Sequence, residues 1–541
     1  MSLVKAKFRN WCFEPVTSLE MAVIDRNAEY LGISRMILME NAGKAIAEEV
    51  YTRWGRSKNI LTVAGLGDNG GDGLVASRYL ANWGFNVKVI LLGRERDIRS
   101  ELTLKNYQIL KYLHNVKLIE ITTPLELLQY EDIFKQCDII IDAIIGTGIK
   151  GSIREPQATA IELINLSKAK KVAVDVPSGL DPDTGNVVDI AVKADLTITM
   201  HRPKRGFFTE LARKYLGELV IVDIGIPREA ELIVGPGDML YLKYSRRRES
   251  KKGDHGRVVI IGGSREFSGA PALTAYAALR MGIDLAIILA PEKTALSIKA
   301  QRPDFIAIPL EGDYLTYNHI NEILKYCERA NIVILGPGVG TRDETVKTCI
   351  EILEKIVPTG KYVIIDADGI KALALTERYD LVKSNVILTP HEGEFKLLTK
   401  ESLPKDLLDK IEKFKEIVRS KFQGGTILLK GNVDLVSNGY KVKINYTGNP
   451  GMTIGGTGDV LTGIVAGVLR MINEPVEAAA IGAFITGLAG DLSVRELGYH
   501  ILPTDIIEKI PIILKNLINI DEEIDRALHV VSRNFLKKLL K

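Results

Sequence analysis

The sequence contains few cysteines, few aromatic residues and little net charge. Its four cysteines (Cys12, Cys137, Cys327 and Cys349) stand far apart and form no CxxC pair, which argues against a zinc site or a disulfide framework. Aromatic residues make up 6% of the chain, the formal net charge is +3, and no basic stripe alternates with aromatic residues. This composition does not predict nucleic-acid binding.

Long apolar runs are also missing. The longest uncharged apolar stretch, "AAAIGAFITGLAG", is shorter than the roughly 20 residues that span a bilayer. The start of the chain, "MSLVKAKFRNWCFEP", lacks the apolar core of a signal peptide. A hydrophobic fraction of 46% and a charged fraction of 26% are ordinary for a globular protein with sizeable cores. We therefore expect a cytoplasmic protein without membrane contact.

The two halves of the 541-residue chain share one pattern of short apolar runs, glycine-rich turns and amphipathic stretches. Continuous apolar runs are typical of strands buried on both faces, and the helical patterns between them indicate βαβ units. The predicted fold class is α/β with mostly parallel sheets. The predicted strands lie in "NILTVAGLG", "NVKVILLG", "CDIIIDAIIGTG", "KKVAVDVPSG", "ADLTITM" and "GELVIVDIGI", then in "GRVVIIGGS", "LAIILAP", "NIVILGPGVG", "KYVIIDADG", "NVILTPHEG" and "GTILLKG".

A polar stretch, Lys243 to Gly256, separates the halves and is typical of a solvated linker. Its Arg246, Arg247 and Arg248 could instead form a phosphate-attracting edge of the second site. The chain ends in a segment that resembles an extra amphipathic helix. We therefore predict domains at residues 1–240 and 241–505 and a helical extension at 506–541.

The loop "VAGLGDNGGDG", Val63 to Gly73, follows a predicted strand and opens a helix. Glycines let the backbone approach a ligand closely, and a helix N-terminus favours an anion. The loop matches neither GxGxxG nor the lysine-bearing P-loop. Its Asp68, Asn69 and Asp72 add oxygen atoms that a dinucleotide fingerprint does not need.

Two further loops carry acids at strand ends. Asp142 precedes the turn "GTG", and Asp175 and Ser178 follow another strand. Because ligands bind at the carboxyl ends of parallel strands, Asn69, Asp142 and Ser178 could converge as oxygen ligands of a hard cation. Asp175 is a candidate general base, since the pKa of a buried acid can shift toward the working pH. Each acid taken alone could equally be a capping carboxylate.

The motifs "GLGDNGGDG", "DAIIGTGIKG" and "VAVDVPSGLDPDTG" resemble the NAD(P)H-hydrate epimerase family, from Met39 to Pro227. The resemblance implies a Rossmann-like three-layer domain that interconverts the R and S epimers of NADHX and NADPHX, the hydrated reduced cofactors. It implies potassium on Asn69, Asp142 and Ser178, with Asp175 near the reacting carbon. The implied substrate-binding residues are Asp68, Asn69, Gly70, Gly71, Asp72, Gly146, Thr147, Gly148, Ile149, Lys150, Gly151, Ser152 and Asp175. Asp68 departs from the family, which usually has asparagine there.

In the second half, "TIGGTGDVLTG" places four glycines around Asp459 and leads into an apolar helix. Unpaired N–H groups and the helix dipole at such a turn favour phosphate. Asp459 could cap the helix. It could instead act as a base toward a hydroxyl beside a phosphoryl donor, where positioning and charge stabilisation dominate the reaction.

This turn resembles the anion hole of ribokinase-like kinases. The segments "KGDHGRVVIIGGSREFSGAPALTAYAALRMG", "LGPGVG", "VIIDADG", "LTPHEGEF" and "LLKGNVDLV" resemble ADP/ATP-dependent NAD(P)H-hydrate dehydratase over Lys252 to Leu497. The resemblance implies a ribokinase-like three-layer α/β/α domain in which a nucleotide phosphorylates the hydrate hydroxyl of the S epimer. Loss of phosphate then restores NADH or NADPH. ADP is the donor implied for microbial members, and magnesium is expected from the nucleotide chemistry.

The resemblance implies a role for each matching position, and Asp459 would activate the hydroxyl. The implied contacts to the hydrate are Ala270, Gly338, Pro390, His391, Glu392, Gly393, Glu394 and Asp459; those to the nucleotide are Lys430, Gly431, Asn432, Val433, Asp434, Asn449, Pro450, Gly451, Gly455, Gly456, Thr457 and Gly458. "HEGEF" departs from the commoner His-Pro-Gly-Glu, and "DADGIKAL" keeps Asp366 and Asp368 but not the residues that usually follow.

The favoured hypothesis is a bifunctional repair enzyme, expected to form a homo-oligomer. The first alternative is a ribokinase-like small-molecule kinase, acting for example on a hydroxymethylpyrimidine, with a nucleotide-binding N-terminal module. The second is a first half that is a degenerate nucleotide-binding or interaction module. The joint presence of Asp142, Asp175 and Ser178 argues against the second alternative.

Overall fold

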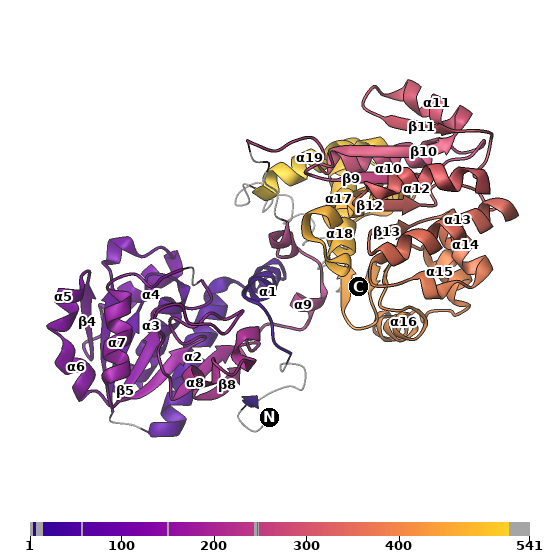
Figure 1. Cartoon of the computed structure of the whole chain (residues 1–541). Helices are drawn as coiled ribbons and strands as arrows, with labels where there is room; N and C mark the ends of the chain where they lie inside the picture. The colour runs from indigo at the N-terminus through magenta and orange to yellow at the C-terminus, as the bar shows by residue number, and fades with distance from the viewer. Residues whose placement is uncertain are drawn as a thin grey trace. The chain divides into compact units, whose positions relative to one another are not determined.

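The computed structural model of the chain describes residues 4–6, 14–55, 58–148, 151–242, 246 and 248–518 (Figure 1). The chain forms two compact units, Met1–Ala230 and Glu231–Lys541. The boundary precedes the predicted residue 240 because the intervening segment joins the second unit. There the Val234 N–H donates to the Ile444 carbonyl at 2.9 Å, and Asp238 forms a buried ion pair with Lys443 at 2.7 Å.

The first unit is built around a fully parallel sheet with helices on both faces. The strands are β1 (Val4–Ala6), β2 (Asn59–Ala64), β3 (Asn86–Leu92), β4 (Val116–Ile121), β5 (Ile139–Ala143), β6 (Lys170–Val174), β7 (Leu196–Met200) and β8 (Glu218–Val222). The helices are α1 (Ser18–Tyr30), α2 (Arg35–Trp54), α3 (Asp68–Asn82), α4 (Glu101–Leu110), α5 (Pro124–Leu128), α6 (Glu131–Gln136), α7 (Gln157–Leu166), α8 (Arg213–Leu216) and α9 (Glu229–Leu232). The strand order is β1-β8-β7-β6-β5-β2-β3-β4.

Alternate residues of the central strands explain the three layers. On β2, Ile60 and Ala64 pack in a cluster with side chains of α1 to α4. Leu61 and Val63 point to the other face and pack with side chains of α5 to α7. Both faces of the sheet are covered, which is why these strands read as continuous apolar runs rather than as alternating ones.

The second unit contains a mixed sheet. Its strands are β9 (Arg257–Ile261), β10 (Leu285–Pro291), β11 (Ile306–Leu310), β12 (Ile332–Leu335), β13 (Tyr362–Ile365), β14 (Val386–Leu388), β15 (Thr426–Leu429), β16 (Asp434–Ser437) and β17 (Val442–Asn445). The helices are α10 (Gly269–Arg280), α11 (Glu292–Gln301), α12 (Ile320–Glu328), α13 (Asp343–Ile356), α14 (Asp368–Thr376), α15 (Glu392–Thr399), α16 (Leu407–Lys421), α17 (Thr457–Ile472), α18 (Pro475–Leu497) and α19 (Pro503–Ile518). The order is β11-β10-β9-β12-β13-β14-β15-β16-β17, parallel up to β15 and antiparallel in the last two pairings.

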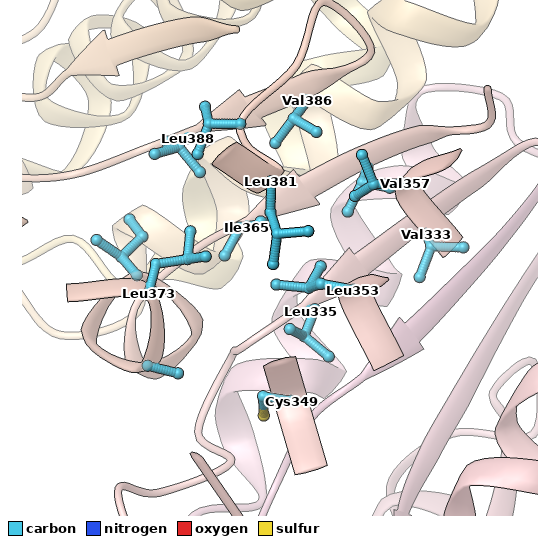
Figure 2. Packing of buried hydrophobic residues seen from close by; sticks show 14 of the residues in the cluster. Val333, Leu335, Cys349, Leu353, Val357, Ile365, Leu373, Leu381, Val386 and Leu388 are labelled. Carbon is cyan, nitrogen blue, oxygen red and sulfur yellow. The ribbon is translucent and has the colours of Figure 1, made fainter. Parts of the chain in front are cut away.

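One face of this sheet carries a large core formed with α12 to α16. Figure 2 shows Leu335, Ile365 and Leu388 from neighbouring strands beside Leu353 and Leu373 from the covering helices. The other face is covered by α10, α17 and α18, which pack against one another. The arrangement is the expected three-layer α/β/α fold, as the first unit is the expected α/β fold.

Helices α18 and α19 bear on two predictions from the sequence. Helix α18 is long and apolar enough to cross a membrane, but 89% of its most apolar window is buried inside the unit, as in the core helix of a globular domain. Helix α19 begins at Pro503, before the predicted extension at residue 506, and packs against α10 and α18. Residues 519–541, the rest of that predicted extension, lie outside the described part.

Candidate active sites

The glycine loops of the first unit meet at one edge of its sheet. Strands β2, β5 and β6 are neighbours, and Ala64 pairs with Ala143 at their carboxyl ends. A cleft of about 870 Å³ opens there. Of the predicted substrate-binding residues it is lined by Asp68, Asn69, Asp72, Gly146, Thr147, Gly148, Gly151, Ser152 and Asp175. Ile149 and Lys150 lie outside the described residues.

Gly70 and Gly71 are not among the residues that line this cleft. They lie in the first turn of α3 and allow it to pack closely. A Cβ on Gly70 would lie 2.1 Å from the Gly65 carbonyl oxygen, and one on Gly71 would lie 2.5 Å from Met39 Cε. Because these two glycines lack side chains, α3 can pack closely beneath the cleft.

Asp142 and Ser178 contact each other in the buried floor of this edge. The Ser178 hydroxyl lies 2.6 Å from Asp142 Oδ1, and the Ser178 N–H donates to Asp142 Oδ2 at 2.8 Å. Burial raises the pKa of Asp142 to about 6, although these hydrogen bonds oppose the shift. The Ile145 N–H donates to the Ser178 hydroxyl at 2.9 Å, which brings the next loop to the pair.

Asn69, the third predicted cation ligand, contacts the same loop. A Cβ built on Gly146 would lie 3.1 Å from Asn69 Oδ1. The Asn69 amide nitrogen is buried and has no hydrogen-bond partner within the described residues. The amide oxygen of Asn69, like the carboxylate of Asp142 and the hydroxyl of Ser178, is a donor of the kind that a hard cation takes.

Asp175 is held by a lysine that the sequence analysis did not identify. Lys204 Nζ donates to Asp175 Oδ1 at 2.6 Å, and the Lys204 side chain is 1% exposed. Thr199 Oγ1 donates to the same oxygen at 2.9 Å, and the Met200 N–H at 3.2 Å. Asp175 has φ +61°, a strained conformation for a residue with a side chain, and such strain is typical of functional sites.

Asp68, the departure from the family pattern, pairs with Arg35 at 2.6 Å. Both side chains are about half exposed, so the pair contributes about 1 kcal/mol at most to stability. The pair nevertheless places a positive charge beside the added carboxylate at the cleft.

A wall of the cleft was not predicted at all. Ser18, Met21, Ala22 and Asp25 from α1 line it, together with Lys204. The only sequence signal is their helical spacing, which brings residues i, i+3, i+4 and i+7 to one face.

In the second unit, α17 begins at the turn "GGTGD". Gly456 precedes it with φ +99°, and no side chain caps the first turn. A Cβ on Gly455 would meet nothing within 4 Å, and one on Gly458 would meet only Lys430 Nζ, at 3.2 Å. The first-turn N–H groups of α17 therefore face open space beside a lysine, the arrangement that favours an anion.

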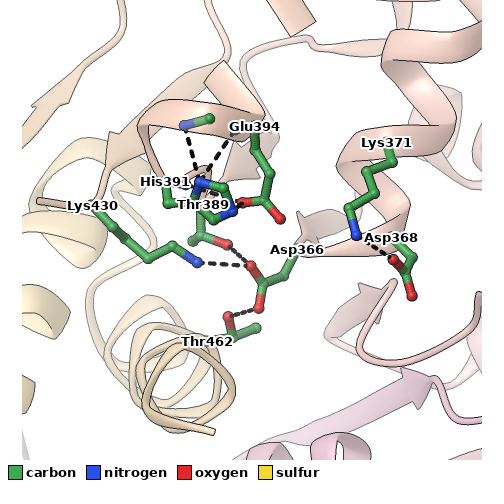
Figure 3. A network of polar contacts seen from close by, with 9 residues as sticks. Asp366, Asp368, Lys371, Thr389, His391, Glu394, Lys430 and Thr462 are labelled. Atoms are coloured by element: carbon green, nitrogen blue, oxygen red, sulfur yellow. Dashed lines mark hydrogen bonds and ion pairs between the residues drawn. The ribbon is translucent and has the colours of Figure 1, made fainter. Parts of the chain in front are cut away.

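Asp366 fixes this helix end to the sheet. It follows β13 and accepts hydrogen bonds from Thr389 Oγ1 at 2.7 Å and from Thr462 Oγ1 on α17 at 2.9 Å. Lys430 Nζ lies 3.3 Å from the same carboxylate (Figure 3). Residues from three strand ends and one helix thus converge at this edge.

Asp459 lies one turn before Thr462 on the same helix. Burial and the neighbouring Asp366 carboxylate raise the pKa of Asp459 to about 7, with Lys430 opposing the shift. Burial lowers the pKa of Lys430, but Asp366 and Glu394 outweigh it and raise the pKa overall. The site therefore combines a fixed ammonium with a carboxyl group that titrates near neutrality.

His391 and Glu394 form a capping box at the start of α15. The N–H groups of Gly393 and Glu394 donate to His391 Nδ1 at 3.0 and 3.3 Å, and the His391 N–H donates to Glu394 Oε2 at 3.0 Å (Figure 3). The His391 side chain is 59% exposed. Its role in the structure is to cap the helix and hold the loop.

The other predicted contact residues of the second unit are close neighbours or form hydrogen bonds that hold its loops. A Cβ on Gly338 would lie 3.6 Å from Ala270 Cβ, so these two are neighbours. The Pro390 carbonyl accepts the Lys430 N–H at 2.8 Å. Asp434 closes the turn over Gly431, Asn432 and Val433 by accepting the Gly431 N–H at 3.0 Å. Asn449 Oδ1 accepts the Gly451 N–H at 2.9 Å across Pro450. Glu392 forms an ion pair with Lys410, and Thr457 Oγ1 donates to the Met452 carbonyl at 3.1 Å.

Comparisons with known proteins give matches to both units. A family model described as NAD(P)H-hydrate dehydratase matches residues 258–512, and one described as YjeF-related protein N-terminus matches residues 35–206. A bifunctional NAD(P)H-hydrate repair enzyme from Pyrobaculum aerophilum is 51% identical over 93% of this chain and 98% of its own length. One from Methanothermobacter thermautotrophicus is 41% identical over 95% and 97%.

Among solved structures, a ribokinase-like superfamily protein from Enterococcus faecalis V583 is 25% identical over 53% of this chain and 96% of that chain, with a TM-score of 0.45. The sequence relatives extend over both units, and both units carry the loops on which the resemblance rests. The chain belongs to the family of bifunctional NAD(P)H-hydrate repair enzymes.

Proposed function

We propose that the first unit interconverts the R and S epimers of NADHX and NADPHX and that the second dehydrates the S epimer at the expense of ADP or ATP. The observation that carries this proposal is the pairing of an uncapped glycine turn with Asp459 in a chain whose other unit has an epimerase-type cleft. Membership of the family favours this reaction over a small-molecule kinase, the alternative left open by the sequence.

In the second unit, Asp459 accepts the proton of the hydrate hydroxyl as that oxygen attacks the terminal phosphorus of the nucleotide. The N–H groups at the start of α17 and the Lys430 ammonium stabilise the negative charge on the transferring phosphoryl group. Hydroxide is a poor leaving group, whereas phosphate departs readily; its loss, together with loss of a proton from the adjacent ring carbon, restores the reduced nicotinamide. ADP is the donor we favour, as the resemblance implies for microbial members.

Magnesium would be bound in this site mainly by the phosphates of the nucleotide. Within the described residues no group of three or more His, Cys, Asp or Glu could hold a metal ion. Magnesium commonly binds through substrate phosphates with only one or two carboxylates, so this donor set does not exclude it. The roles proposed for Asp459, the α17 N–H groups and Lys430 do not depend on the position of magnesium.

In the first unit, potassium fits the oxygen-rich floor formed by Asn69, Asp142 and Ser178. The support is the oxygen that each of these side chains offers, the contact between Asp142 and Ser178, and the position of Asn69 and Ser178 beside the loop at Ile145 and Gly146. A bound cation would supply positive charge that favours ionised Asp142 and holds the loop against the substrate. Asp175, held in place by Lys204, would bind the substrate near the reacting carbon.

The test follows recovery of reduced nicotinamide absorbance from an R and S mixture of NADHX, with magnesium and either ADP or ATP, with and without potassium. The wild type should recover nearly all of the cofactor. Asp175→Asn should stop after a fast phase close to the S fraction, and Asp459→Asn should give no recovery. If the nucleotide is instead consumed to form a stable phosphorylated alcohol, a kinase function replaces the repair function.

The cytoplasmic location and homo-oligomeric state expected from the sequence remain predictions. Sedimentation of the purified chain measures the oligomeric state directly.

A further inference from the structure

Helix α1 presents one face to the epimerase cleft. Ser18, Met21, Ala22 and Asp25 line the cleft at helical spacing, while Val23 and other residues of the helix are buried. This helix precedes residues 35–206, which match the family model, so that match gives none of its residues a role. Asp25 is the only residue of this face that titrates.

The carboxylate of Asp25 is available for chemistry. No side chain donates a hydrogen bond to it within the part of the chain that the structure describes, although protein largely encloses it. Burial raises the pKa of Asp25 to about 7. Among the charged groups around it, Lys204 and Arg35 lower the pKa, and Asp175 and Asp68 raise it.

Asp175, in contrast, already has several partners within the protein. Its Oδ1 accepts hydrogen bonds from Lys204, Thr199 and the Met200 N–H. A carboxylate held in this way is suited to orienting a substrate.

A second carboxyl group lines the same cleft. Asp72 lies in the second turn of α3 and is among the residues that line the cavity. Burial, together with the charges of Asp175, Asp68 and Asp25, raises its pKa well above the usual value. Two carboxyl groups that disfavour ionisation together can divide one proton between them.

We propose that Asp25 exchanges a proton with the hydroxyl of the hydrate during epimerisation and that Asp72 exchanges the second proton. This inference rests on the proposed epimerase function of the same cleft. Epimerisation needs a donor that helps the hydroxyl leave and an acceptor for the water that returns on the other face of the ring.

The steps balance without any further reactant. Asp25 donates its proton to the hydroxyl oxygen, the carbon–oxygen bond breaks, and water leaves with the electron pair of that bond. The lone pair of the adjacent ring nitrogen forms a carbon–nitrogen double bond, and Asp175 faces the resulting cation. Water then adds to the opposite face while Asp72 accepts its proton, and the reverse direction exchanges the two roles.

The experiment measures R to S interconversion of NADHX by chromatography without any nucleotide, so that the dehydratase cannot act. Asp25→Asn should lower the enzymatic rate by about 100-fold or more, the usual contribution of a general acid or base. The control is Glu29→Gln, an exposed residue of the same helix, which should keep the wild-type rate. Dehydration of S-NADHX with ADP or ATP by both variants checks that the chain is intact.

The pH dependence gives a second readout that needs no variant. One proton must be present on the Asp25 and Asp72 pair, so kcat/KM of the wild type should fall as the pH rises above about 7. A rate for Asp25→Asn within threefold of wild type, or no fall in kcat/KM of the wild type above neutrality, overturns the inference. Absence of epimerisation by the wild type would instead refute the proposed function.

Discussion

Replacement of Asp459 by asparagine should abolish dehydration and also stabilise the second unit at alkaline pH. The pKa of Asp459 is raised to about 7 by burial and by Asp366. Between pH 3.8, the ordinary pKa of an aspartate, and about pH 7, the native state therefore holds a proton that the unfolded state has lost. Stability falls as the pH rises through that window, and asparagine removes the effect because it cannot ionise.

The size of the gain in unfolding free energy follows from the pKa shift of Asp459. A rise from 3.8 to about 7 corresponds to about 4 kcal/mol at about 1.4 kcal/mol per unit, an upper bound for a side chain that retains some contact with solvent. We expect about 1–4 kcal/mol at pH 8, which raises the melting temperature of this unit by about 2–8 °C. The gain should shrink to less than about 1 kcal/mol near pH 4, where the carboxyl group is protonated in the native state and nearly half protonated in the unfolded state.

Asp343 offers a matched control. It also lies in the first turn of a helix, α13, but it is exposed. Favourable interaction with the helix dipole alone predicts that neutralising either acid costs about 0.3–1 kcal/mol. Calorimetry at pH 4 and pH 8 without nucleotide distinguishes the two effects. The reasoning fails if Asp459→Asn melts at or below the wild-type temperature at pH 8.

Two further pairs of variants test the packing of the sites. Gly456→Ala should destabilise the second unit by about 1–3 kcal/mol because Gly456 has φ +99° and no room for a Cβ, whereas Gly455→Ala faces open space and should be nearly neutral; equal effects in urea unfolding would contradict this. Lys204→Met should destabilise the first unit by about 3–5 kcal/mol at neutral pH because it leaves the Asp175 carboxylate without its buried partner. Arg35→Met removes an exposed ion pair and should cost about 1 kcal/mol at most, so similar unfolding midpoints for the two variants would refute the assigned burial.

The strands that the sequence predicts are those buried on both faces. The predicted runs correspond to β2, β3, β5 to β10 and β12 to β15. Strands β4 and β11 were missed because they lie at or next to the sheet edge and carry exposed residues, with burial that alternates instead of running continuously. The β16 and β17 hairpin was missed for a related reason, since short antiparallel strands leave no long apolar run.

The residues of the candidate sites also fall into those with a local sequence signal and those without one. Loops that follow buried strands carry their own signal, because glycines and acids at a strand end are adjacent in the chain; Asp142, Asp175 and Asp459 were found from it. Lys204 and Asp25 carry no such signal. A lysine and an aspartate in polar segments read as exposed residues, and only the fold brings them to the cleft.

The amino-acid sequence alone determined the fold class, the two candidate catalytic loops and the family, because each depends on local pattern or on residues close together in the chain. Tertiary structure decided the protonation chemistry. Lys204 forms a buried ion pair with Asp175, burial and Asp366 raise the pKa of Asp459, and α1 places Asp25 in the cleft. These effects come from burial and from charges contributed by distant segments, and such interactions exist only once the chain has folded.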